Sequence, residues 1–181
     1  MNEKQIKHTS KFLSLVLRHK PETIGIELDP NGWTDVGVLI ERANQFGVSL
    51  DLATLKAIVD TNEKKRFAFD ETSNRIRASQ GHSLNIDLGH ANQKPPKILY
   101  HGTAEKAVAA ILEYGLEKRD RQHVHLSSDI TTAIKVGQRH GKPVVFQVRS
   151  ELMHADNFEF FLSDNGVWLT EHVPSKYLDL Q

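Results

Sequence analysis

The sequence predicts an α+β protein built from two parts, and three observations carry this expectation. The first part of the chain holds three amphipathic helical stretches followed by two alternating segments typical of a β-hairpin. The second part holds several short strands and two helices. Between them, residues 79–97 contain two glycines and two prolines with little periodicity, which is typical of a connecting segment. We therefore expect two domains, residues 1–90 and residues 91–181.

The first predicted helix covers residues 6–19 and ends before Pro21, because proline disfavours helical geometry in the residue before it. Arg18 and His19 therefore lie at the C-terminus of this helix. Its apolar stripe consists of Phe12, Leu13, Val16 and Leu17.

Two further helices and a hairpin complete the first part. Thr34 is placed to cap the second helix and Gly47 to end it, while Asp51 is placed to cap the third. Residues 66–70 and 75–78 alternate around a polar turn, which predicts the hairpin. Three helices followed by a hairpin form a winged-helix arrangement, which is common in nucleic-acid-binding proteins and is also used for protein contacts.

The second part begins with a short strand, and Thr103 is placed to cap a helix that ends at Gly115. A second helix begins after Ser128 or Asp129, runs to about residue 139 and closes at Gly141. The strands expected here are residues 98–101, 123–126, 144–148, 158–162 and 167–170.

Composition limits the classes of function that fit the chain. Its 181 residues are 39% hydrophobic, which is enough for a packed core. The 23 basic and 23 acidic residues balance, so no whole-chain field attracts nucleic acid or an anionic membrane, and any anion site must be local. The absence of cysteine excludes disulfides, thiolate nucleophiles and cysteine-ligated metals. No apolar run approaches the roughly 20 residues of a membrane helix, so we expect a cytoplasmic protein.

Familiar cofactor motifs are absent. The sequence has no GxGxxG after a strand, no GxxxxGK[ST] and no HExxH, which argues against a Rossmann site, a P-loop and a zinc protease. His123 and His125 would share one face of a strand, and such a pair can bind a metal. More often one histidine of such a pair is packed and the other solvated, and no acidic cluster nearby supplies a third ligand. We expect no metal.

Two local patterns could serve an anionic ligand. In the segment Tyr100-His101-Gly102-Thr103, glycine would let a ligand approach the backbone beside a helix N-terminus, although a tight turn with a capping threonine explains the segment equally well. Guanidinium groups suit phosphate because they donate paired hydrogen bonds and stay charged, which draws attention to Arg18 and to Arg66 after two lysines. The alternative is that the helix dipole favours Arg18 and that the lysines form a solvated face.

Six segments in chain order resemble one family, the NAD-dependent RNA 2'-phosphotransferases, whose bacterial members are called KptA. The six segments are residues 17–19 (LRH), 65–67 (KRF), 76–83 (IRASQGHS), 100–103 (YHGT), 121–126 (RQHVHL) and 166–170 (GVWLT). The match extends over nearly the whole chain. It implies an N-terminal winged-helix lobe that binds RNA and a C-terminal ADP-ribosyltransferase-like lobe that binds NAD as co-substrate without a Rossmann motif.

The resemblance also implies a reaction, which removes an internal 2'-phosphate from RNA, as in tRNA splicing. The phosphate attacks the nicotinamide ribose and expels nicotinamide, which leaves ADP-ribosylated RNA. The ribose 2''-hydroxyl then attacks phosphorus and releases RNA together with ADP-ribose 1'',2''-cyclic phosphate. The catalytic residues implied are Arg18, His19, Arg66 and Arg121. The NAD-binding residues implied are His101, Gly102, Thr103 and His125, with Val167 in the same cleft.

Val167 stands where many protein-modifying relatives carry a glutamate, although Glu171 follows closely. A phosphate monoester needs no base because it already carries nearly two charges at neutral pH. Gln80, His82 and Ser83 either contact substrate phosphates or cap the junction of the lobes.

The resemblance leaves some questions open. The sequence does not indicate the role of Arg77, the oligomeric state or the natural RNA. One alternative function is an ADP-ribosyltransferase that caps terminal phosphates of RNA or DNA. The other is a non-catalytic winged-helix module that senses NAD or ADP-ribose.

Overall fold

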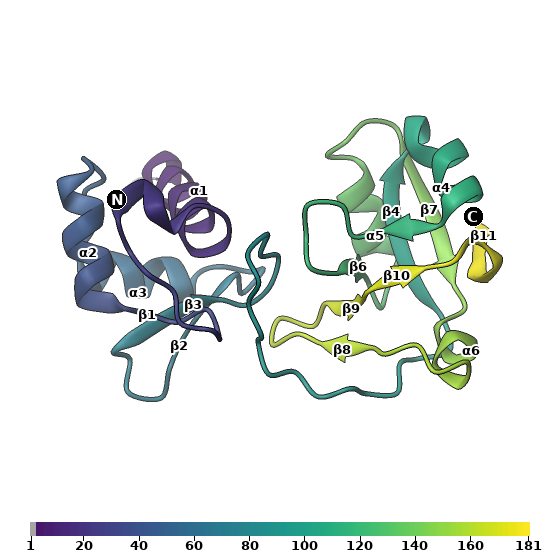
Figure 1. The fold of residues 1–181 in the computed structure, drawn as a ribbon. Coiled ribbons are helices and arrows are strands. Elements are labelled where there is room, and N and C mark those ends of the chain that lie inside the picture. The colour runs from purple at the N-terminus through teal and green to yellow at the C-terminus, as the bar shows by residue number, and fades with distance from the viewer. Residues whose placement is uncertain (1–2) are drawn as a thin grey trace. The chain divides into compact units, whose positions relative to one another are not determined.

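The structure is a computed structural model that describes residues 3–181. The chain divides into two compact units, unit 1 (Met1–Gly89) and unit 2 (His90–Gln181), each with its own hydrophobic core. Figure 1 shows that helices and small sheets occur in both units, so the fold is α+β.

Unit 1 combines three helices with a small antiparallel sheet. Its helices are α1 (Glu3–Arg18), α2 (Val36–Gln45) and α3 (Leu52–Asp60), with a 3₁₀ turn at Pro21–Ile24. Its strands are β1 (Thr34–Asp35), β2 (Phe67–Phe69) and β3 (Arg75–Ala78), in the order β1-β3-β2. The hairpin register pairs Phe67 with Ala78. Apolar side chains of all three helices and the hairpin share one core, which fixes the hairpin beside α1.

The cap of α2 differs from the expectation. Thr34 does not cap this helix, because its backbone pairs with Ile76 in the sheet. Asp35 takes the cap instead and accepts a hydrogen bond from the backbone nitrogen of Val38 at 2.9 Å. Asp51 caps α3 as expected, by accepting from the backbone nitrogen of Thr54 at 2.7 Å.

Unit 2 contains three small antiparallel sheets. Its helices are α4 (Val108–Tyr114), α5 (Ile130–Gly137) and α6 (Ser150–Ala155), with 3₁₀ turns at Glu105–Ala107 and Ser175–Tyr177. Strands β4 (Leu99–Ala104), β7 (Pro143–Val148) and β11 (Leu178–Leu180) form the sheet β11-β7-β4. Strands β6 (Val124–Leu126), β8 (Phe161–Leu162) and β9 (Trp168–Thr170) form the sheet β6-β9-β8. Strands β5 (Leu116–Glu117) and β10 (His172–Val173) form a third pair.

The expectation of a cap at Thr103 was wrong. Strand β4 continues past this residue to Ala104, which pairs with Pro143, so Thr103 lies inside the strand opposite Val144. Pairing with β7 satisfies the backbone that the local pattern would have assigned to a helix start. The second helix also ends earlier than expected, at Gly137, and its cap is Asp129, which accepts from the backbone nitrogen of Thr132 at 2.7 Å.

Gly102 has a packing role in β4. A Cβ atom at this position would lie 1.7 Å from the backbone oxygen of Ala133, and one at Gly137 would lie 2.6 Å from the backbone oxygen of Thr103. Helix α5 therefore packs with its backbone directly against β4, and the two glycines make this approach possible. On this face of β4, Gly102 makes room for helix α5, whereas the sequence analysis had suggested that the glycine makes room for a ligand.

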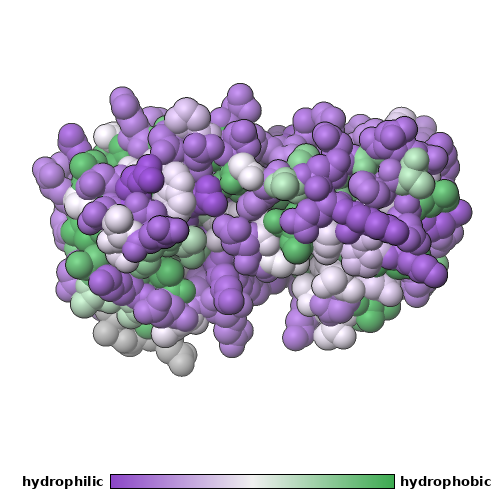
Figure 2. Space-filling model, turned by 90° about the horizontal axis from the view of Figure 1, so that it is seen from below, coloured by the Kyte–Doolittle hydropathy of each residue, from purple (hydrophilic) through white to green (hydrophobic). Residues whose placement is uncertain are grey.

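The surface is predominantly hydrophilic on the face shown in Figure 2, where apolar side chains form small separate groups. Among the residues that the structure describes, the most exposed large apolar side chains are Phe46, Leu112, Tyr114 and Leu180. Within residues 3–181 no helix combines the length and the apolar character needed to cross a bilayer.

We predict that Gly102→Ala destabilises unit 2 by about 3 kcal/mol or more, because a backbone atom cannot move aside as a side chain can. The free energy of unfolding is measured by denaturant titration with Trp168 fluorescence in a Trp33→Phe background, since the chain has two tryptophans. Gly166→Ala is the control, since Gly166 has a φ of +78° but open space around its Cβ position. It should cost about 1 kcal/mol. Equal losses in the two variants would contradict the packing role of Gly102.

Candidate functional site

The first cluster of predicted site residues lies in unit 1, at the C-terminus of α1. The backbone oxygen of Arg18 accepts a hydrogen bond from the backbone nitrogen of Ser83 at 3.0 Å. The Nδ1 atom of His19 lies 3.0 Å from the hydroxyl oxygen of Ser83. The segment that follows the hairpin is therefore fastened to the end of α1, and it brings His19 and Ser83 together.

Arg66 joins this cluster from the start of the hairpin. The Nη2 atom of Arg18 donates to the backbone oxygen of Arg66 at 3.4 Å, and the Arg18 guanidinium lies 6.0 Å from the centre of the Phe67 ring. The Nη1 atom of Arg66 donates to Oδ1 of Asn62 at 3.4 Å. The backbone oxygen of Arg66 also accepts from the backbone nitrogen of Ser79 at 2.9 Å. Both arginines are thus placed by backbone contacts between α1, the hairpin and the segment after it.

His82 is the buried centre of this cluster. Its side chain is 1% exposed, and neither ring nitrogen has a hydrogen-bond partner among the described residues. Burial lowers the pKa of His82 to about 4, and the nearby charges of Arg18, His19 and Arg77 act in the same direction. The ring is therefore neutral at pH 7 and is surrounded by cationic groups.

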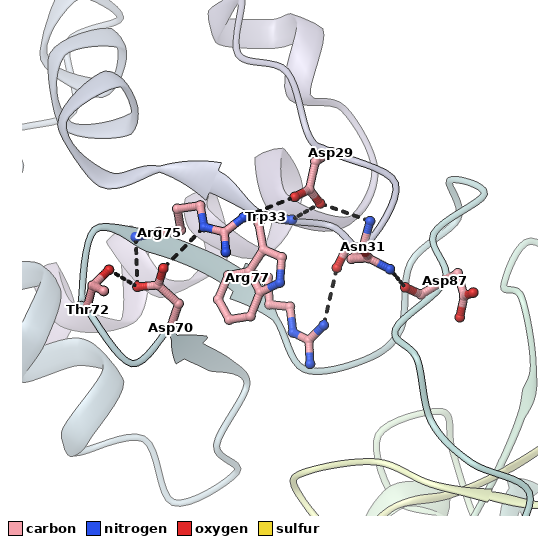
Figure 3. Close-up of polar contacts among 8 residues, drawn as sticks. All are labelled: Asp29, Asn31, Trp33, Asp70, Thr72, Arg75, Arg77 and Asp87. Carbon is pink, nitrogen blue, oxygen red and sulfur yellow. Dashed lines mark hydrogen bonds and ion pairs between the residues drawn. The ribbon is translucent and has the colours of Figure 1, made fainter.

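Arg77, whose role the sequence left open, lies in strand β3 of the hairpin. It holds the loop around Asn31 (Figure 3) and the connecting segment around Leu88 to that strand. Its guanidinium lies 4.5 Å from the centre of the Trp33 ring, and Nη1 donates to the backbone oxygens of Asn31 at 3.4 Å and Leu88 at 3.5 Å. The side-chain nitrogen of Asn31 donates to the backbone oxygen of Asp87 at 2.6 Å. These contacts give Arg77 a structural role in unit 1.

Gln80, another residue predicted for the site in unit 1, is half-buried. Its side-chain oxygen has no hydrogen-bond partner among the described residues. Lys64 and Lys65 are exposed, as a solvated face would be. The sequence reasoning missed Asn62, which supports Arg66, and Trp33, which stacks on Arg77. The position of Asn62 just after a helix was a usable signal, whereas the stacking of Trp33 depends on tertiary packing.

The second cluster lies in unit 2 and joins His101, His125 and Arg121. The Nδ1 atom of His101, on β4, lies 3.1 Å from the backbone oxygen of His125, on β6. A carbonyl oxygen only accepts, so Nδ1 of His101 carries the proton in this contact. The Nη1 atom of Arg121 lies 3.0 Å from Nδ1 of His125. A guanidinium only donates, so this nitrogen of His125 is the acceptor, and the His125 ring is neutral in this arrangement.

The environment of His101 keeps its ring neutral as well. Burial lowers the pKa of His101, and the charges of Arg121 and Arg119 lower it further, although the hydrogen bond to His125 opposes them. With Nδ1 protonated, Nε2 of His101 has a lone pair that can accept a hydrogen bond from a ligand hydroxyl. Thr103 lies two residues along β4 and therefore on the same face of the strand, opposite the face of Gly102.

Val167 and its neighbours form a turn. The backbone nitrogen of Val167 donates to the hydroxyl of Ser163 at 3.0 Å, and the side chain is half-buried. Glu171 is exposed and pairs with Lys118 at 3.3 Å. Glu171, the carboxylate that follows Val167 in the sequence, is thus held by a surface ion pair.

His123 packs against an aromatic side chain of unit 2. Its ring packs 5.8 Å from that of Phe161, centre to centre, and burial lowers its pKa. Among residues 3–181 no three histidine, aspartate or glutamate side chains are grouped so that they could hold a metal ion.

Comparison with known proteins identifies the family. A sequence model of the "RNA 2'-phosphotransferase, Tpt1 / KptA family" matches residues 4–172. The chain is 52% identical to a protein of Flavobacterium johnsoniae over 181 residues, which covers the whole of both chains. It is 55% identical to a protein of Agrobacterium fabrum over 170 residues, covering 94% of this chain and 91% of the other. Both relatives bear the name "Probable RNA 2'-phosphotransferase". This chain therefore belongs to the RNA 2'-phosphotransferase family, as the sequence resemblance indicated.

We predict that His82 makes unit 1 less stable in mild acid. The pKa of His82 is lowered to about 4 in the folded state from 6.5, so the unfolded state binds more protons between these values. The free energy of unfolding should be greatest above about pH 6.5 and fall by about 3 kcal/mol as the pH falls towards 4. Trp33 fluorescence in a Trp168→Phe background reports unit 1.

The matched variant is His82→Gln, which cannot gain a proton in this range. Its unfolding free energy should have a flatter pH dependence than that of the parent, whatever its absolute stability. His8→Gln, which removes an exposed histidine of α1, should keep the parent profile. If His82→Gln and the parent lose stability in parallel, the buried neutral state of His82 is wrong.

Proposed function

We propose that this chain removes an internal 2'-phosphate from RNA by transferring it to NAD. The products would be RNA with a free 2'-hydroxyl, nicotinamide and ADP-ribose 1'',2''-cyclic phosphate. The observation that carries the proposal is the cluster of Arg18, His19 and Arg66 in a member of the RNA 2'-phosphotransferase family. In this view unit 1 is a winged-helix RNA-binding lobe, and unit 2 is an ADP-ribosyltransferase-like lobe.

Unit 1 offers what a phosphate dianion requires. A phosphate monoester has its second pKa near 6, so it carries close to two negative charges at neutral pH. The Arg18 guanidinium lies against the backbone oxygen of Arg66, so both arginines belong to one part of unit 1, and each guanidinium can donate paired hydrogen bonds to phosphate oxygens. The neutral His82 ring does not add to the charge of this region. Gln80 and Ser83 supply further polar atoms from the segment after the hairpin.

Unit 2 has donor and acceptor groups that fit NAD. The unprotonated Nε2 of His101 can accept a hydrogen bond from a ribose hydroxyl, and Thr103 adds a hydroxyl on the same face of β4. Arg121, which contacts His125, can donate to a phosphate of either substrate. The residue at 167 is a valine, so no carboxylate at this position activates a hydroxyl acceptor. This fits a phosphate nucleophile, which needs no base.

The proposed transfer has two balanced steps. First, an oxygen of the RNA 2'-phosphate forms a bond to C1'' of the nicotinamide ribose, the bond from C1'' to nicotinamide breaks, and ADP-ribosylated RNA results. Second, the 2''-hydroxyl of that ribose forms a bond to phosphorus, the bond from phosphorus to the RNA 2'-oxygen breaks, and the proton goes to the 2'-oxygen. Arginines stabilise the charge that builds on the phosphoryl oxygens in the second step.

His19 is the group in unit 1 best suited to supply this proton. An imidazole exchanges a proton near neutral pH, whereas a guanidinium does not. The contact between its Nδ1 atom and Ser83 fixes the orientation of the ring, as a general acid requires. We therefore assign the protonation of the leaving 2'-oxygen to His19.

Turnover tests the proposal directly. Incubation of the chain with NAD and a short RNA that bears one internal 2'-phosphate should release nicotinamide, the dephosphorylated RNA and the cyclic phosphate in equal amounts. A stable ADP-ribosylated RNA with no cyclic phosphate would identify a transferase that stops after the first step. Binding of NAD with no nicotinamide release would identify a sensing module.

We predict that His19→Ala slows the second step about a hundredfold, because it removes the general acid but leaves both arginines. Rapid-quench analysis should show ADP-ribosylated RNA accumulating while the first step proceeds. His8→Ala, an exposed histidine on the same helix, should match the parent. Unchanged release of the cyclic phosphate by His19→Ala would remove the assignment.

A further inference from the structure

Unit 1 has a groove that adjoins the phosphate cluster and shares Arg66 with it. It lies between α1 and the end of α3, both labelled in Figure 1, and has a volume of about 460 Å³. Its lining includes four basic residues, Lys7, Lys11, Lys64 and Arg66, and one acidic residue, Glu63. The whole chain has no net charge, so this groove concentrates positive charge locally.

The groove leads to the proposed phosphate cluster along α1. Lys7, Lys11, Ser14 and Arg18 follow one another at spacings of four, three and four residues, which places them on one stripe of the helix. The first three line the groove, and the fourth belongs to the cluster. At a rise of 1.5 Å per residue this stripe is about 16 Å long, a length of several nucleotides.

The opposite wall reaches the same cluster through Arg66. This arginine lines the groove, and its side chain contacts Asn62, which also lines it. The hydroxyl of Thr61 donates to the backbone oxygen of Ala57 at 2.6 Å, which holds this wall at the end of α3. Groove and cluster therefore share one residue and form a continuous surface within unit 1.

We propose that this groove binds the backbone phosphates of the nucleotides next to the 2'-phosphorylated one in a single RNA strand. The proposal rests on the function proposed above and adds a subsite for the flanking chain. Basic side chains along the walls suit phosphates spaced along a strand, while Ile6 and Ile58 in the lining offer apolar contact to the sugars. An acidic protein segment would lack the regular spacing and is an alternative that the experiment separates.

The test compares two substrates with the same 2'-phosphate, a dinucleotide and a longer oligonucleotide. The full chain should bind the longer RNA more tightly, with a Kd measured by fluorescence anisotropy in the absence of NAD. Lys11→Glu should weaken binding of the longer RNA about tenfold and lower the slope of log Kd against log salt concentration by about 0.7 or more. It should leave the Kd and turnover of the dinucleotide unchanged, which also shows that the variant is folded.

Lys56→Glu is the matched control, since Lys56 is an exposed lysine of α3 that does not line the groove. It makes the same change in net charge and should leave both substrates unaffected. Equal effects of Lys11→Glu and Lys56→Glu, or a wild-type Kd that is the same for both RNA lengths, would overturn the groove proposal while dinucleotide turnover still supported the proposed function. Failure of the wild-type chain to process the dinucleotide would instead refute the proposed function.

Discussion

The burial of a neutral imidazole among cationic groups is the constraint on which unit 1 depends. Arg18, His19 and Arg77 all disfavour a charge on His82, and burial disfavours it most. Bringing cations together costs electrostatic free energy, and the backbone hydrogen bonds that fasten Ser83 to α1 and Ser79 to Arg66 oppose that cost. A bound phosphate would lower it further, because its charge has the opposite sign. The folded unit thus holds its guanidinium groups in place before any anion arrives, as electrostatic catalysis requires.

Unit 2 also fixes the orientation of its candidate site residues, but it does so through close backbone packing and hydrogen bonds. The absence of side chains at Gly102 and Gly137 lets α5 lie against β4, which leaves the other face of that strand for His101 and Thr103. The hydrogen bond from His101 to the backbone of β6 fixes its tautomer, and Arg121 fixes that of His125. Two neutral imidazoles with assigned donor and acceptor nitrogens suit the recognition of hydroxyls. Because both imidazoles are neutral, the positive charge in this cluster of unit 2 is carried by arginine.

The sequence predicted the features that local pattern controls. Apolar periodicity and Pro21 placed Arg18 at the end of a helix, and alternation placed Arg66 at the start of a hairpin. It was wrong at Thr103, where a plausible helix cap competes with pairing to β7, and that pairing depends on a partner about forty residues away along the chain. The burial of His82 and the stacking of Arg77 on Trp33 could not be predicted, because both arise when distant segments pack. The resemblance named the residues of each cluster, and the structure supplied the contacts that orient them.

In the proposed function, unit 1 recognises the 2'-phosphate itself. The most direct measurement is the Kd of the full chain, without NAD, for two RNA oligonucleotides that differ only in one internal 2'-phosphate. If two guanidinium groups each make a charge-assisted contact worth about 1.5 kcal/mol, the phosphorylated RNA should bind about a hundredfold more tightly. Equal affinity for the two RNAs would contradict the account.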